Sequence, residues 1–129
     1  MKLTDYIKEA GATDHETYDV VADRMADDLN LRLMHYSMGL CTEAAEVQDM
    51  LKKVFIYGKD FDPVNLKEEL GDIMWYMARI CAACGWEFEE LAQLNIDKLK
   101  LRYGDKFTKH AALNRDLKTE RELLEKGGK

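Results

Sequence analysis

The sequence predicts an all-α protein, a four-helix-type bundle with a short N-terminal helix and a C-terminal helical tail. Apolar residues recur at steps of three and four along most of the chain, as they do on one face of a helix, and no run of period two indicates a strand. A single proline, with 47% hydrophobic and 34% charged residues, is typical of a helical globular protein. Glycines and capping residues then divide the pattern into separate helices.

The first half of the chain contains the signals of a short helix and a long one. The pattern predicts a helix over residues 3–10 that ends at Gly11, and a capping box over residues 13–16 marks another helix start. A long helix is expected over residues 29–57, ending at Gly58.

The second half contains equally clear boundaries. Asp62 is an expected N-cap and Pro63 the first helical residue of a helix that runs to residue 84 and ends at the following glycine. Glutamates occupy the first turn of a further helix over residues 87–103, where the helix dipole favours them. A weaker amphipathic stretch over residues 115–125 closes the chain.

Length and charge limit the organisation and the partners. We predict one domain over residues 1–129, with a core of about residues 29–103 and a tail of residues 104–129. The net charge of −6 and the lack of a basic block argue against nucleic acid or an anionic membrane as partner. No apolar run is long enough for a transmembrane helix, and an odd number of cysteines, 3, favours the cytoplasm.

Four carboxylates interrupt the apolar faces of the two central helices. Glu43 takes a core position in one stripe and Glu69 takes one in the next. Glu46 and Asp72 each follow three residues later, so both members of each pair can reach one site. The two stripes are Leu29, Leu33, Tyr36, Leu40, Glu43, Val47, Met50, Val54 and Leu66, Glu69, Ile73, Tyr76, Ile80.

These carboxylates predict a divalent-metal site. A buried carboxylate without a matching charge is costly, and a cation matches four of them at once. Ligation by oxygen alone favours Mg²⁺, with Mn²⁺ as the other possibility, over zinc. A di-iron bundle would need a glutamate three residues before a histidine on two helices, and no histidine here has one.

A cationic stripe on the fourth helix has two interpretations. Asn95, Lys98 and Arg102 continue the core face at steps of three and four. Either they form a solvated helix end whose charges complement the dipole, or Lys98 and Arg102 face the carboxylates and bind phosphate. Lys53, about two turns beyond Glu46, can reach the same region.

Two further sets of residues are interpreted as structural. Trp75, Tyr76 and Trp86 are expected in the core rather than as a platform for a nucleobase. Gly39 and Gly71 lie inside predicted helices, where glycine is unfavourable, and indicate close helix packing. Gly71 is also expected to leave room between Glu69 and Asp72.

Taken together, these residues resemble the MazG-like branch of the all-α nucleoside triphosphate pyrophosphohydrolases. The resemblance covers about residues 31–122 and is to the short, single-domain members. The family carries Glu-x-x-Glu, a gap, and then Glu-x-x-Asp. The matching segments are Glu43-Ala-Ala-Glu46, Tyr57-Gly-Lys59, Glu68-Glu69-Leu-Gly-Asp72, Asp97-Lys98-Leu-x-x-Arg102-Tyr103 and Leu113-Asn-Arg-Asp-Leu117.

The resemblance implies an Mg²⁺-dependent hydrolase that converts a (deoxy)nucleoside triphosphate to the monophosphate and pyrophosphate through a metal-activated water. It implies homodimers or homotetramers with sites near the subunit interface. It also implies roles for individual residues. Glu43, Glu46, Glu69 and Asp72 would bind metal, Lys98 and Arg102 would contact phosphates, Glu68 would support the ligands, and Asn95 is a weaker substrate contact. Either one of the four metal ligands or Glu68 would act in catalysis by accepting the proton of the attacking water.

Two alternatives remain open at the level of sequence. One is a dUTP/dCTP- or (p)ppGpp-directed hydrolase of the same fold, because no residue determines base choice. The other is a non-catalytic, metal-stabilised helical interaction module. The intact set of carboxylates together with Lys98 and Arg102 favours an enzyme, since such a module needs no cations that face phosphate.

Overall fold

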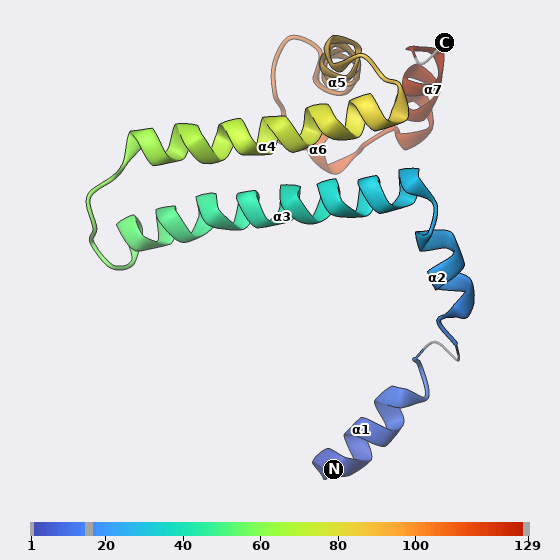
Figure 1. Cartoon of the computed structure of the whole chain (residues 1–129). Helices are drawn as coiled ribbons and strands as arrows, with labels where there is room; N and C mark the ends of the chain where they lie inside the picture. The colour runs from blue at the N-terminus through green and yellow to red at the C-terminus, as the bar shows by residue number, and fades with distance from the viewer. Residues whose placement is uncertain (1, 15–16, 128–129) are drawn as a thin grey trace.

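The computed structural model describes residues 2–14 and 17–127, and these contain seven helices and no strand. The predicted all-α fold is therefore confirmed. Figure 1 shows a long antiparallel hairpin with a helical unit at one end and a helical arm that leads away from it. The helices are α1 (Leu3–Gly11), α2 (Asp19–Met25), α3 (Asp28–Phe55), α4 (Pro63–Cys84), α5 (Phe88–Tyr103), α6 (Lys109–Leu113) and α7 (Leu117–Gly127).

The hairpin of α3 and α4 is the largest packed unit, and the two helices lie side by side along their length (Figure 1). Its ends follow the predicted signals. The Asp62 carboxylate accepts hydrogen bonds from the backbone N–H groups of Val64 and Asn65 at 2.9 and 3.1 Å. Gly85 ends α4 with a φ of 71°, a left-handed conformation that favours glycine.

The two mid-helix glycines differ. A Cβ on Gly39 would collide with the ring of Tyr76, so glycine allows α3 and α4 to approach closely there. Gly71 is exposed, and no described atom beyond its own helix backbone and chain neighbours lies within 4 Å of where its Cβ would be. The close packing expected at Gly71 is wrong within this chain. Instead, the missing side chain of Gly71 leaves open space beside the carboxylates of α4.

The C-terminal region forms a second unit. α5 is seen end-on in Figure 1, so it runs across the direction of the hairpin, and α7 packs against it. The predicted tail helix is present as α7, and the short helix α6 was not anticipated from the sequence. The side chain of Thr108 caps α6 by accepting a hydrogen bond from the N–H of Ala111 at 3.1 Å.

The first two helices form an arm that leads away from the hairpin. The predicted N-terminal helix is present as α1, while the next helix begins at Asp19, later than the capping box over residues 13–16 indicates. Two members of that box, His15 and Glu16, lie outside the described residues. α2 is tied to α3 because the Asn30 side chain donates a hydrogen bond to the carbonyl oxygen of Arg24 at 2.8 Å.

The single chain buries few large side chains. Its accessible surface is 10671 Å², whereas a compact monomer of 14.9 kDa is expected to expose about 7,000 Å². Trp75 and Trp86 are 51% and 56% exposed, so their expected core positions are wrong for this chain, and Tyr76 is half-buried. Among the described residues, no helix combines the length and apolar character that crossing a bilayer requires.

Candidate metal centre and its surroundings

Three of the four predicted carboxylates converge on one point of the hairpin. One carboxylate oxygen each from Glu43 of α3 and from Glu69 and Asp72 of α4 lie within 4.8 Å of one another. Glu69 is only 8% exposed, and its Oε1 accepts a hydrogen bond of 2.8 Å from the side-chain amide of Asn65, one turn earlier on α4. The antiparallel packing of α3 and α4 thus joins residues that are distant in sequence. We call these three residues the carboxylate triad.

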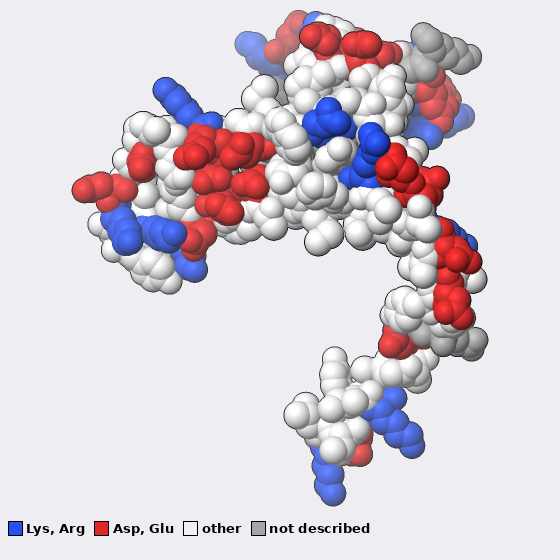
Figure 2. Space-filling model, in the orientation of Figure 1, with Lys and Arg blue, Asp and Glu red and all other residues white. Residues whose placement is uncertain are grey.

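The triad is surrounded by like charge. Partial burial and the neighbouring carboxylates of Glu46, Asp72 and Glu69 raise the pKa of Glu43. Figure 2 shows a concentration of acidic side chains over the half of the hairpin nearest the loop between α3 and α4, with basic side chains on either side. Every charge that raises the pKa of Glu43 comes from a neighbouring carboxylate, and among the described residues no lysine or arginine forms an ion pair with the triad.

The remaining predicted acidic residues lie close to the triad without joining it. Glu46 is exposed, lies near enough to raise the pKa of Glu43, and is outside the group that converges within 4.8 Å. Glu68 is also exposed, on α4 immediately before Glu69. Lys53 forms an ion pair of 2.7 Å with Asp49, one turn earlier on α3. The proposed roles of Glu46, Glu68 and Lys53 remain predictions.

Asn95 and Lys98 lie on α5 and border an apolar groove. This groove has a volume of about 580 Å³ and includes Met77 of α4 and Phe88 of α5 among its lining residues. Asn95 is exposed, and Lys98 is half-buried. Within the single chain, both residues therefore line a groove whose other lining residues are apolar.

Arg102 is held by the C-terminal helix. Its Nε donates to Glu120 Oε1 at 2.7 Å and its Nη2 donates to Glu120 Oε2 at 2.6 Å. Arg115 adds a third hydrogen bond to Glu120 Oε2 at 2.8 Å. These contacts lower the pKa of Glu120 to about 2, Arg102 being the larger cause. We call Arg102, Arg115 and Glu120 the arginine clasp, and it joins α5 to α7.

The sequence analysis did not identify Glu120 or Asn65 as important residues. Glu120 is 4% exposed, more deeply buried than any member of the triad. Its position between two arginines depends on the turn between α6 and α7, which periodicity does not reveal. The hydrogen bond from Asn65 to Glu69 had a visible signal, because the two residues are four apart on one helix.

Aromatic residues continue the hairpin face beyond the triad. The ring of Trp75 lies edge-on to those of Tyr36 and Tyr76, at centroid distances of 6.1 and 4.9 Å. The guanidinium carbon of Arg79 lies 5.6 Å from the centroid of the Tyr36 ring, within the range of a cation–π contact. Trp75 follows Asp72 by one helical turn, so a half-exposed aromatic surface adjoins the carboxylates.

The chemistry of the triad fits a hard divalent cation. All of its donors are carboxylate oxygens, which Mg²⁺ and Mn²⁺ prefer, and their mutual repulsion in the absence of a cation is offset when one binds. The described residues place no cysteine or histidine in this group, so the donor set does not resemble a zinc site. The triad therefore offers a set of carboxylate oxygens that could hold a divalent metal ion.

Comparison with known proteins places this site in a family. Residues 31–107 match the MazG nucleotide pyrophosphohydrolase domain, and this range contains the triad and Arg102. The gene 37 protein of Mycobacterium phage L5 is 34% identical over an alignment of 77 residues, and the match covers 54% of this chain. The match covers 65% of that relative, just under two thirds of its length. No solved structure matches the chain.

Proposed function

Because the chain belongs to the MazG nucleotide pyrophosphohydrolase family, we propose that it hydrolyses a (deoxy)nucleoside triphosphate to the monophosphate and pyrophosphate with Mg²⁺. The observation that supports this most directly is the carboxylate triad, whose oxygens converge within 4.8 Å. Mn²⁺ is an alternative metal with the same ligand preference. The substrate is an anion, and an acidic site needs a metal to bind it.

The triad would hold the metal and position the phosphates. Glu43, Glu69 and Asp72 supply its oxygen ligands, with Glu46 as the predicted fourth, and Asn65 holds the Glu69 carboxylate in place. Bound Mg²⁺ would neutralise phosphate charge, including the charge that develops during phosphoryl transfer, and would lower the pKa of a coordinated water. The protein's own part is to fix these oxygens on two rigid helices.

We also propose that the working form is a homodimer or homotetramer. Met38 and Met74, on the two hairpin helices, are 61% and 57% exposed, and the single chain exposes about 3,700 Å² more than a compact monomer of its mass. A standard interface removes about 800 Å² from each partner. We therefore propose that Lys98 makes its predicted phosphate contacts only in the assembled oligomer.

The nucleoside end of the substrate is proposed to lie along the aromatic face beyond the triad. Trp75 offers a half-exposed ring one helical turn from Asp72, and aromatic faces stack on nucleobases. This arrangement supports a nucleotide of any base, so dUTP/dCTP- and (p)ppGpp-directed activities remain alternatives. A cytoplasmic location is part of the proposal, and all three cysteines being free supports it.

The deciding experiment is release of pyrophosphate from the eight common NTPs and dNTPs, with Mg²⁺ and with EDTA. We expect metal-dependent release of pyrophosphate with the monophosphate as second product. The panel is then extended to (p)ppGpp and modified nucleotides. If Mg²⁺ raises the melting temperature but none of these substrates is hydrolysed, the proposal fails and a non-catalytic, metal-stabilised module replaces it.

A further inference from the structure

The N-terminal helix α1 has an apolar face that nothing in its own chain covers. Leu3, Tyr6 and Ile7 lie on one side of this helix and are 77%, 56% and 66% exposed. Among the described residues, no other helix packs extensively against α1. α1 has 9 residues, and isolated helices shorter than about 12–15 residues are only marginally stable in water. A helix this short is stable when it packs against another surface. α1 therefore needs a surface to pack on.

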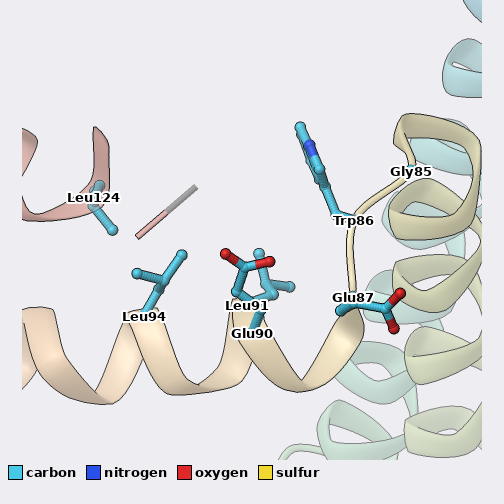
Figure 3. Close-up of a pocket in the computed structure, with 7 residues that line it drawn as sticks. All are labelled: Gly85, Trp86, Glu87, Glu90, Leu91, Leu94 and Leu124. Carbon is cyan, nitrogen blue, oxygen red and sulfur yellow. The ribbon is translucent and has the colours of Figure 1, made fainter. Parts of the chain in front are cut away.

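A groove of matching character lies on the C-terminal unit. It runs between α5 and α7 as two adjoining hollows of about 410 and 580 Å³, which share Leu91, Leu94 and Leu124. Figure 3 shows the side chains of Trp86, Leu94 and Leu124 around the open space of the first hollow. The lining of the second is mostly apolar. The groove follows α5 for most of its length, enough for the roughly 14 Å of α1.

We propose that α1 of one copy of this chain packs into the groove between α5 and α7 of a second copy. The proposal pairs an amphipathic helix that lacks a groove with an apolar groove that lacks a helix, and each copy carries both. A two-fold dimer satisfies both copies at once by exchanging the arms. The surface excess of about 3,700 Å² leaves ample area for such an exchange in addition to a hairpin contact.

Both surfaces carry charges of both signs at their edges, so opposite charges can be paired. Glu87, Glu90 and Lys98 border the groove, and α1 carries Lys8 together with Asp5 and Glu9. The arm leads away from its own α5 in Figure 1, and the Asn30–Arg24 hydrogen bond fixes the start of α3 to α2. This geometry favours a second copy over the same chain as the acceptor. The inference rests on the proposed self-association but not on the proposed reaction.

The test uses the full chain with a photoreactive benzoylphenylalanine in place of Tyr6. Isotopically light copies carry the probe and are mixed with heavy copies that do not, then irradiated and digested with trypsin. We expect light-to-heavy cross-links to the peptides that contain residues 80–98 and 122–126, which line the groove. Cross-links only to light peptides of the probe's own copy, or light-to-heavy links to the hairpin instead, would overturn the proposal.

A pair of variants checks the contact without the probe. Ile7→Glu places a charge on the apolar face, and Thr4→Glu makes the same change of charge on the polar side of α1. Neither residue belongs to the packed hairpin. We expect Ile7→Glu to weaken the dimer about tenfold or more in sedimentation, while Thr4→Glu leaves it unchanged.

The outcomes separate this inference from the self-association on which it rests. A wild-type chain that sediments as a monomer at all concentrations defeats both. A dimer that Ile7→Glu does not weaken, and in which residue 6 forms no cross-link to a second copy, defeats only the arm exchange. Pyrophosphate release is measured in parallel, and its absence would not bear on either result.

Discussion

Glu69 in the triad and Glu120 in the clasp are both buried carboxylates, yet their charges are handled in opposite ways. Glu120 receives three hydrogen bonds from Arg102 and Arg115, so its charge is matched within the chain. Glu69 receives one bond from the neutral amide of Asn65 and faces two further carboxylates. A buried charge that is matched locally fastens the fold, whereas one left unmatched indicates a site for a cation.

The largest difference between the triad and the clasp is expected in their effect on enzymatic activity. Asp72→Asn removes a charge from the triad and should reduce pyrophosphate release by on the order of 10²–10³-fold, because a ligand to the metal is lost. Its melting temperature in EDTA should stay the same or rise, since one repulsive charge has gone. The exposed Glu89→Gln is the matched control and should retain activity. Full turnover in Asp72→Asn would remove the triad from the proposed site.

The next contrast concerns stability. Glu120→Gln leaves Arg102, whose side chain is 13% exposed, without its ionic partner, and should lower the melting temperature by roughly 10 °C. Thermal unfolding followed by circular dichroism measures this. Glu122→Gln, two residues away and exposed, is the control. A Glu120→Gln variant as stable as the control would show that the clasp does not fasten α7 to α5.

Acidification should change the contributions of the clasp and the triad to folding stability in opposite directions. The pKa of Glu120 is lowered to about 2 from 4.5, so its stabilisation is complete above pH 4.5 and is lost as pH falls towards 2. The pKa of Glu43 is raised above 4.5, so protonation on acidification relieves repulsion in the folded state. In EDTA, the stability difference between wild type and Glu120→Gln should therefore shrink below pH 4.5.

For the triad, the corresponding comparison is Glu43→Gln against wild type in EDTA. The variant should be the more stable at neutral pH, and its advantage should fade as Glu43 becomes protonated on acidification. Mg²⁺ at neutral pH should raise the melting temperature of wild type more than that of the variant. Equal responses to Mg²⁺ would contradict metal binding at the triad.

The smallest effect is expected within the clasp itself. The Arg115 side chain is 43% exposed and donates one hydrogen bond to Glu120, whereas Arg102 donates two from a side chain that is 13% exposed. Arg115→Gln should therefore destabilise the protein by no more than a few degrees, and less than Arg102→Gln. Thermal unfolding of the two variants side by side orders the two contributions. A larger loss of stability in Arg115→Gln than in Arg102→Gln would show that the exposure of the arginine side chain does not determine its contribution.

Much of the fold was readable from local patterns. The N-cap at Asp62, the left-handed glycine at Gly85 and the stripe through Tyr36 and Met50 all depend on neighbours along one helix, and the structure confirms each of them. Long-range features were harder to predict. Gly71 carried the same signal as Gly39, but only Gly39 meets a facing ring, because helix register decides which glycine lies at the contact.

The triad was predictable for the same reason as the helices. Glu43 and Glu69 interrupt apolar periodicity, and a polar interruption of a core stripe is visible without a structure. The partner of Arg102 was not visible, since Glu120 approaches it through the turn between α6 and α7. The same cationic stripe is compatible with binding a phosphate or a carboxylate, and sequence spacing does not distinguish the two anions.

By itself the sequence determined the all-helical class, the main helix boundaries and the set of acidic residues on the hairpin, because periodicity and capping act over a few residues. The tertiary structure decided which charges are matched. It brought the Glu43 carboxylate to those of Glu69 and Asp72, and it brought Glu120 to Arg102. Electrostatic energy depends on the distances between groups that are remote in sequence, and only the packing of α3 on α4 and of α7 on α5 sets those distances.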